Sequence, residues 1–467
     1  MYLNQNHFWA NFLKLIIALA FPVYYLTLNY FNRYSMDDFG LAYSANSIGP
    51  WASAVSFYFG QQGSFIGIFI TNLAFCVPLF VYYIIFISVQ FFALYFFFQT
   101  LWKITQIAHS RINTFLISSL ILSSLYFSAP SIPELWHSTN ITALYTLMFP
   151  ILLFAISLLL QNKPLLATPF LVAMMQTRIS WALILFSCYT IHCVYYYFVF
   201  RKLDKHKVVA AILMIISTLI YVIAPGNEVY RKLLLQISAE STFNNPTFTE
   251  TLRILFDDFM FKKSVYVIAF LLPICILIKN EFIAKITLPK AKVLYPLLGL
   301  IVITTAHTLL LYVATNRFFH APRVWHISGL LFCFTSLYYL LLLKARLTAG
   351  TASNKIVTIS MIALTMLCHS LGLYLIAKTM IVNLPIAKKY AIAFDETIEL
   401  VKHAQVNKGQ YFQVKPLPDS GVLPSWCLVH FGDGHGVGFS ISRFCQVKFD
   451  VVEEPTEKTV IKRESAK

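Results

Sequence analysis

The chain has 467 residues and a net charge of +16, and 58% of its residues are hydrophobic while only 12% are charged. A soluble domain carries about twice that share of charged residues, so the composition excludes an ordinary soluble protein. The basic residues form no groove-like or aromatic-interleaved motif, which excludes a nucleic-acid partner. Apolar runs of about 20 residues recur, the length needed to cross a bilayer. We therefore predict an all-α polytopic membrane protein.

Eleven membrane spans are predicted in chain order. The first continues to Tyr30 and lacks a basic start, which favours an uncleaved helix over a signal peptide. The second is too long for one upright crossing. We interpret it as one tilted helix, with a pair of crossings bent at Pro78 as the alternative. The predicted spans are residues 8–30, 65–100, 113–128, 141–160, 164–177, 179–200, 208–224, 265–279, 293–316, 324–343 and 355–379.

The charged residues predict an orientation for these spans. One alternate set of loops is short and rich in Lys and Arg, which is typical of the cytoplasmic side. The opposite loops are expected to face outward, and they hold most of the acidic residues that precede residue 380. Their greater length is one explanation for this split, and an active site at the outer face is the other. The outer acids are Asp37, Asp38, Glu134, Glu228, Glu240, Glu250, Asp257 and Asp258.

Two domains are predicted. Residues 1–380 form the transmembrane domain, and residues 381–467 form a small, more polar extracytoplasmic tail. The tail contains a helix-like stretch at 388–405 and a Gly- and aromatic-rich stretch around 431–444 that suggests short strands. Cys427 and Cys445 lie in the tail. In an oxidising compartment they could form a disulfide, and two free thiols are the alternative.

The sharpest motif is the acidic pair Asp37-Asp38, which directly follows the first span. Two adjacent carboxylates at a membrane surface raise each other's pKa or share a cation. Either state suits a general base or a ligand of a divalent metal such as Mg²⁺ or Mn²⁺. The alternative is a pair at a turn or a helix N-terminus in solvent.

The second outer loop brings Glu134, Trp136 and His137 within a few residues of one another. Trp at a membrane boundary is expected from the aromatic belt, but a carboxylate and an imidazole beside it are not. Such loops are typical of sugar-binding sites, because an aromatic face covers the C–H groups of the sugar ring while the polar side chains bind its hydroxyls. The alternative is an interfacial anchor with incidental polar neighbours.

Two further outer loops carry basic residues that could hold a lipid phosphate or pyrophosphate. In the third loop Asn227 and Arg231 are four residues apart, so a helix would place them on one face. The short fourth loop carries Arg317, His320 and Arg323. Basic residues are unexpected there, because Lys and Arg normally concentrate in cytoplasmic loops. Arginine binds phosphate through bidentate, charge-assisted contacts. The alternative for both loops is arginine that snorkels to the interface.

These features together resemble bacterial polytopic glycosyltransferases of the GT-C kind, which use polyprenyl-phosphate-linked sugars. The closer likeness is to O-antigen-glucosyltransferase-like membrane proteins. It is carried by Asp37-Asp38, the Glu134/Trp136 loop, Ala224-Pro-Gly-Asn227 followed by Arg231, and the polar tail. The resemblance implies a hexosyltransferase of the bacterial inner membrane that modifies a cell-envelope glycan or lipid, such as lipopolysaccharide. An adjacent acidic pair differs from the spaced or Asp-Glu versions in some relatives.

The resemblance also implies residue roles. Asp37 or Asp38 would deprotonate the acceptor hydroxyl, or associate with a divalent cation, and Arg231, Arg317 or Arg323 would hold the lipid phosphate. Direct displacement at the anomeric carbon would invert it. One alternative is a transporter or flippase for a lipid-linked or anionic substrate, although such proteins place ionisable groups near the midplane and carry internal repeats. A glycan polymerase or ligase is another, separated by product length.

Overall fold

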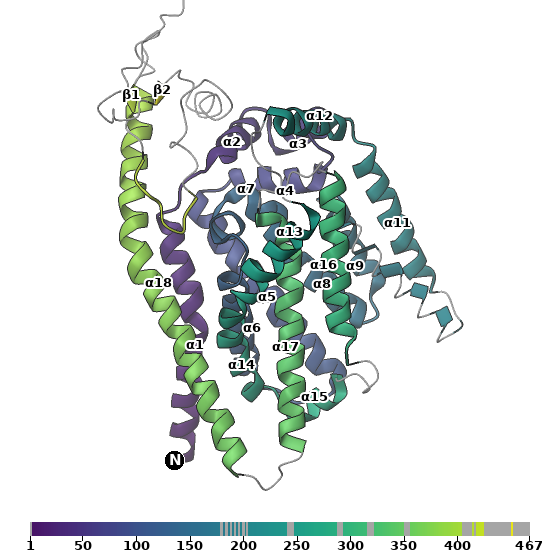
Figure 1. Ribbon diagram of the computed structural model, residues 1–467, viewed down its shortest axis with the longest axis vertical. Coiled ribbons are helices and arrows are strands. Elements are labelled where there is room, and N and C mark those ends of the chain that lie inside the picture. Colours follow the sequence, from purple (N-terminus) through teal and green to yellow (C-terminus); the bar gives the residue numbers. More distant parts are fainter. Residues whose placement is uncertain are drawn as a thin grey trace, which may run out of the picture.

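The computed structural model is a bundle of helices (Figure 1). The upright helices are α1 (Tyr2–Tyr30), α5 (Leu79–Thr105), α6 (Arg111–Phe127), α8 (Met148–Leu160), α9 (Pro164–Met175), α11 (Lys205–Val222), α14 (Ser264–Leu277), α16 (Tyr295–Ala314), α17 (His326–Ala349) and α18 (Lys355–His403). The structure describes residues 2–177, 181–182, 185–186, 189–190, 193–194, 197–198, 201, 204–240, 247–286, 293–314, 322–349, 355–403, 413–414, 417–424 and 450–451.

Shorter elements join the upright helices. One end of the bundle carries α2 (Met36–Ile48), α3 (Pro50–Gly60), α4 (Phe65–Phe75), α7 (Thr139–Ile141), α12 (Pro225–Glu240) and α13 (Phe248–Ile254), and α15 (Asn280–Ile286) lies at the other end (Figure 1). Three segments have π-helical hydrogen bonding: η1 (Pro133–His137), η2 (Thr142–Thr146) and η3 (Leu255–Phe261). A 3₁₀ turn, η5 (Pro322–Trp325), precedes α17, and β1 (Gln413–Val414) pairs in parallel with β2 (Asp450–Val451).

The fold is that of a helical membrane protein. Six segments in the described part of the chain are long and apolar enough to cross a membrane. They are Phe8–Tyr30, Leu79–Thr105, Thr139–Leu160, Lys205–Val222, Arg323–Leu347 and Ile362–Glu399. Five shorter apolar helices accompany them: Phe65–Phe75, Arg111–Phe127, Pro164–Met175, Ser264–Leu277 and Tyr295–Leu309. Most of the predicted span 179–200 lies outside the described residues.

The prediction of one tilted helix over residues 65–100 is wrong. Helix α4 ends at Phe75, α5 begins at Leu79, and Pro78 is the N-cap residue between them. Proline lacks a backbone N–H and disfavours helical geometry in the residue before it, so the helix breaks at this point. At a rise of 1.5 Å per residue, α4 is about 16 Å long. It is therefore too short to cross the bilayer upright.

Side-chain contacts between elements far apart in the sequence show which parts of the bundle lie together. At one end Lys14 donates to Asn113, Lys285 to the Thr105 carbonyl and Gln161 to Thr100. The outer loops of the predicted topology meet at the other end, where the second outer loop contacts both the first and the fourth. This end is called the loop-rich end below.

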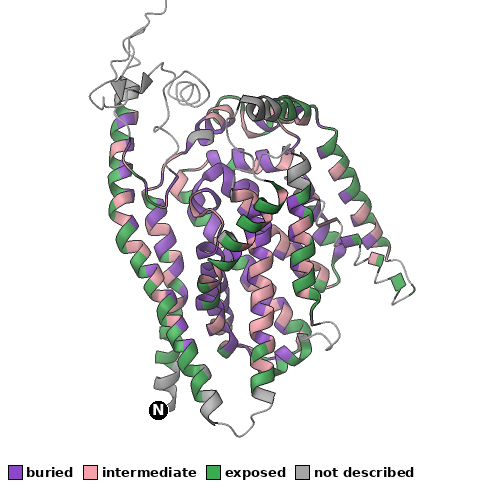
Figure 2. Ribbon diagram, in the orientation of Figure 1, coloured by how far each residue is buried: buried purple, intermediate pink, exposed green. Residues whose placement is uncertain are grey.

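A core of aromatic side chains lies beneath the loop-rich end. Tyr24 and Tyr25 of α1, Tyr83 of α5, Tyr126 of α6 and Trp136 of η1 are almost completely buried. Four pairs of these rings lie edge to face, with centroids 5.3–6.1 Å apart. Such pairs add to the free energy gained from burial. The exposed residues concentrate on outlying helices such as α11 and α18 (Figure 2).

Candidate functional site

Asp38 is completely buried at the start of α2. Its Oδ2 accepts hydrogen bonds from the backbone N–H and the hydroxyl of Ser35, both at 2.8 Å. The bond to the Ser35 N–H belongs to a capping box, in which the side chain of the third helical residue binds back to the backbone of the N-cap residue. The carboxylate therefore fixes the path of the chain where α1 gives way to α2.

The other oxygen of Asp38 reaches the second outer loop. Oδ1 accepts a hydrogen bond from the backbone N–H of Asn140 at 2.9 Å, and the hydroxyls of Ser35 and Ser138 lie 3.4 Å apart. Both carboxylate oxygens thus face hydrogen donors. The carboxylate bridges the start of α2 and the second outer loop. In the described part of the chain, no three His, Cys, Asp or Glu side chains group closely enough to hold a metal.

Asp37 is the second residue of α2. Its side chain lies outside the described part of the structure. Nearby Tyr34 is partly buried, and burial together with the Asp38 carboxylate raises the pKa of its hydroxyl to about 12. Tyr34 therefore stays protonated at neutral pH, and its hydroxyl can donate one hydrogen bond and accept others there.

The second outer loop is folded as two π-helical turns, η1 and η2, around the short α7. π-Helical turns are rare and often mark functional sites. Glu134, Trp136 and His137 are all buried in it. Glu134 Oε2, Trp136 Nε1 and Asn140 Oδ1 have no hydrogen-bond partner among the described residues. The loop thus combines an unusual backbone with unsatisfied polar atoms.

The imidazole of His137 is held between two helices. Its Nε2 lies 2.9 Å from the Tyr126 hydroxyl, and its Nδ1 lies 3.0 Å from the Asn29 side-chain oxygen. Because that oxygen only accepts, Nδ1 carries the proton and Nε2 accepts from Tyr126. Burial lowers the pKa of His137 from 6.5 to about 3. The ring is neutral and enclosed, which makes it a fixed link between the loop and the bundle.

Asn32 and Tyr83 fasten the same loop through its backbone. The side-chain amide of Asn32 donates to the His137 carbonyl at 2.5 Å, and the Tyr83 hydroxyl donates to it as well. The Asn32 amide also lies 2.8 Å from the Tyr83 hydroxyl. The position of the second outer loop is thus set by buried polar side chains of α5 and of the α1–α2 connection.

Glu134 joins the second outer loop to the fourth. Arg323 Nη1 donates to Glu134 Oε1 at 2.8 Å. The side chain of Glu134 is 8% exposed and that of Arg323 is 28% exposed. The pair uses one carboxylate oxygen only. The other predicted residues of this loop, Arg317 and His320, lie outside the described residues.

Asn227 and Arg231 in the third outer loop do not converge. Asn227 Oδ1 accepts from the Gly63 N–H at 2.8 Å and its Nδ2 donates to the Tyr221 carbonyl at 2.6 Å, so it fastens the end of α11 to the α3–α4 turn. A Cβ at Gly63 would lie 2.3 Å from the Tyr221 carbonyl oxygen, so only glycine fits there. Arg231 points to solvent and pairs with Glu228 through two bonds of 2.8 Å.

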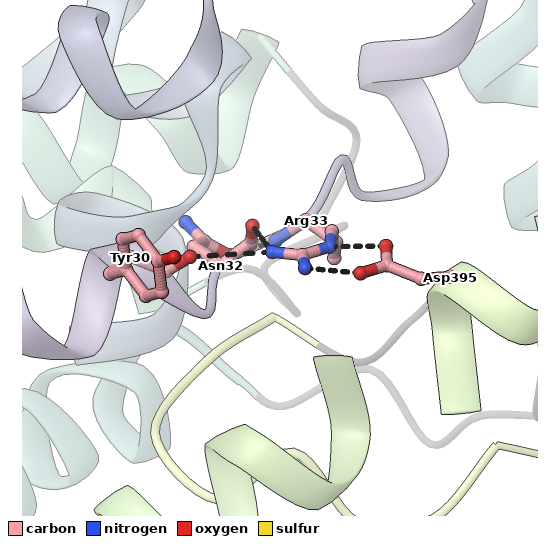
Figure 3. A network of polar contacts seen from close by, with 4 residues as sticks. All are labelled: Tyr30, Asn32, Arg33 and Asp395. Atoms are coloured by element: carbon pink, nitrogen blue, oxygen red, sulfur yellow. Dashed lines mark hydrogen bonds and ion pairs between the residues drawn. The ribbon is translucent and has the colours of Figure 1, made fainter. Parts of the chain in front are cut away.

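Sequence reasoning missed the contact that anchors the first outer loop from outside. Arg33 binds Asp395 of α18 through two parallel bonds of 2.6 and 2.5 Å (Figure 3). Beside it, Phe39 stacks on Phe394. The signal available was weak: Arg33 is an outer charge next to a predicted span, and Asp395 lies in the predicted tail helix. Nothing in the sequence pairs residues 362 positions apart.

Comparisons with known proteins add no assignment to this geometry. No protein-family model, no curated protein and no solved structure matches the chain.

Proposed function

We propose that the protein is a membrane glycosyltransferase that moves a sugar from a polyprenyl-phosphate donor to a glycan or lipid acceptor of the cell envelope. The observation that carries the proposal is the second outer loop. Through the Asn140 N–H it binds Asp38, and through Glu134 it binds Arg323. An acidic segment and a basic residue far apart in sequence are thereby joined at one end of the bundle.

The proposal places the reaction at the outer face of a bacterial inner membrane. The described part of the end opposite the loop-rich end carries Lys103, Lys163 and Lys285, and short Lys-rich loops are typical of the cytoplasmic side. With α4 outside the membrane and residues 179–200 crossing it, the chain would make eleven crossings in a GT-C-like arrangement. Every predicted site residue then falls on the outer side.

We propose different roles for Asp37 and Asp38. Asp38 has no exposed surface, so a substrate atom cannot touch it in this conformation; it serves as a positioning residue. We assign the catalytic base to Asp37, its neighbour on the same helix turn. The base removes the proton of the acceptor hydroxyl as that oxygen attacks the anomeric carbon. The sugar–phosphate bond breaks, and the anomeric centre inverts.

Arg323 is assigned to the departing lipid phosphate. A guanidinium can bind a phosphate through two charge-assisted bonds, and one of its edges is free because the pair with Glu134 uses only Nη1 within the described residues. A fixed positive charge in a site from which water is excluded stabilises the developing phosphate charge strongly. Glu134 would hold the guanidinium in place between turnovers.

The test is a transfer assay on the purified full chain. Polyprenyl-phosphate sugars are supplied one at a time with a membrane-glycan acceptor, with and without Mg²⁺ or Mn²⁺, and released polyprenyl phosphate is measured. We expect one donor to be consumed, and Asp37→Asn and Arg323→Met to stop the release. Arg231→Met is the matched control, because it removes an exposed arginine of the same end. Movement of lipid-linked substrate without bond formation would instead establish a transporter, and long products a polymerase.

A further inference from the structure

Polar side chains without partners lie between α16 and α17. Thr304 and His307 on α16 and Ser328 on α17 are at most 2% exposed. The Thr304 hydroxyl, both ring nitrogens of His307 and the Ser328 hydroxyl find no hydrogen-bond partner among the described residues. Both helices are apolar enough to lie in the membrane.

These side chains face one another across the helix pair. Leu300, Thr304 and His307 recur at helical spacing and so share one face of α16. Leu300 packs in one cluster with Trp325, and the ring of His307 lies 6.3 Å from the ring of Trp325. Ser328 follows Trp325 by three residues, which places it on the same face of α17.

The polar group continues around the first turn of α17 to the second outer loop. His326 is 4% exposed and its Nε2 also lacks a partner in the described part of the chain. It follows Arg323, the partner of Glu134, by three residues. One turn later, a Cβ built at Gly329 would lie 3.6 Å from Pro130 of that loop. The unpartnered oxygen of Glu134 therefore belongs to the same neighbourhood.

Six polar atoms left unsatisfied in this way would be costly. Each buried donor or acceptor without a partner costs about 1–3 kcal/mol, and the cost rises in hydrocarbon. Folded domains are stable by only about 5–15 kcal/mol in total. Something must therefore supply hydrogen bonds to these atoms in the working protein.

We propose that these residues form a binding site for the hydroxyl groups of a sugar, which we name the α16–α17 polar site. Hydroxyl and neutral imidazole side chains both donate and accept, and a carboxylate oxygen accepts, as hydroxyl groups of a sugar ring require. The indole of Trp325 offers an apolar surface beside them. Thr304, His307 and Ser328 carry no formal charge when the imidazole is neutral, which favours a neutral sugar over a phosphate. The identity of the ligand rests on the proposed glycosyl transfer.

Binding is measured directly on the purified full chain. Methyl glycosides of glucose, galactose, mannose and N-acetylglucosamine, and orthophosphate, are titrated while tryptophan fluorescence is followed. Trp325→Phe identifies the signal that belongs to the site. We expect one glycoside to bind saturably, and His307→Leu and Ser328→Ala to weaken it at least about ten-fold, which is about 1.4 kcal/mol. Ser157→Ala is the matched control, since Ser157 is equally buried but bonded within α8.

The outcomes separate this site from the proposed reaction. Thr304→Val replaces an unsatisfied hydroxyl by a methyl group, and Ser328→Ala removes one. Loss of a buried hydroxyl without a partner should keep or raise thermal stability, so weaker binding by either variant cannot be ascribed to unfolding. The inference is overturned if no glycoside binds, if only orthophosphate binds, or if the variants bind as well as the parent chain; water alone then fills the site. Sugar binding without any transfer would refute the glycosyltransferase and leave the site intact.

Discussion

Replacing Asp38 by asparagine should destabilise the protein far more than the same change at Asp37. Asn keeps one carbonyl oxygen and gains an amide that can only donate. If the oxygen faces Ser35, the amide meets the Asn140 N–H; if it faces Asn140, the amide meets both Ser35 donors. Either orientation sets donor against donor in a site with no exposed surface.

The size of the effect follows from the bonds lost. A hydrogen bond to a charged group contributes about 1.5–3 kcal/mol, and a negative charge in the first turn of α2 adds about 0.3–1 kcal/mol. The loss of one bond and the charge gives about 2–4 kcal/mol. Asp37→Asn also removes a negative charge from the first turn of α2, at a cost of about 0.3–1 kcal/mol. Ser35→Ala removes the N-cap hydroxyl and should cost about 1 kcal/mol.

Unfolding of the purified variants in mixed detergent, followed by circular dichroism, measures these differences. The transfer assay is run on the same samples. We expect Asp37→Asn to be nearly as stable as the parent chain but inactive, and Asp38→Asn to be both unstable and impaired. A stable Asp38→Asn protein without activity, beside an active Asp37→Asn protein, would refute the division of roles and make Asp38 the base.

Three further predictions concern the contacts around this site. Arg323→Met should lower the free energy of unfolding by about 3 kcal/mol, because it leaves the buried Glu134 carboxylate unpaired. Adding Glu134→Gln to the same chain should recover part of that loss. Equal stability of the parent chain, the single variant and the double variant would contradict this. Burial holds the pKa of His137 at about 3, so the stability that the neutral ring contributes is complete above pH 6.5. Below pH 6.5 it falls by up to about 1.4 kcal/mol per pH unit, because the unfolded chain binds a proton first. The free energy of unfolding, measured against pH, should therefore decrease less steeply in acid for His137→Gln than for the parent chain. Arg33→Asp and Asp395→Arg should each impair transfer, and the double swap should restore it; because the pair is partly exposed, its coupling in unfolding should stay below about 1 kcal/mol.

The helical membrane fold could be predicted because the signal of an apolar helix is local. Each helix needs only a run of apolar residues, and the alternation of basic loops orders the ends. The same local reasoning explains the error at residues 65–100, where the apolar run hides a break. The sequence indicated Pro78 as the site of a possible bend. Hydropathy alone does not predict a helix break there, because it takes no account of the backbone N–H that proline lacks.

The state of the acidic pair could not be predicted in the same way. Ser35 and Asp38 have the spacing of a capping box, so the local half of the Asp38 environment was readable. The other half comes from the backbone of Asn140, and a backbone donor leaves no trace in the sequence. Likewise, Glu134 and Arg323 are 189 residues apart. Their pairing depends on how η1 and the start of α17 pack, which no motif records.

The C-terminal helix links the membrane-spanning part of the chain to the first outer loop. We predicted a domain boundary at residue 380, and α18 runs across that position from Lys355 to His403. Its first half is apolar enough to cross the membrane, and its second half packs Tyr390 and Phe394 toward the first outer loop. Pro385 lies inside α18 and has no backbone N–H, so the helix lacks one hydrogen bond close to this boundary. The Arg33–Asp395 pair and the Phe39–Phe394 stack hold the second half of α18 against the start of α2. Truncation after residue 380 would therefore remove the contacts that Asp395 and Phe394 make with the first outer loop.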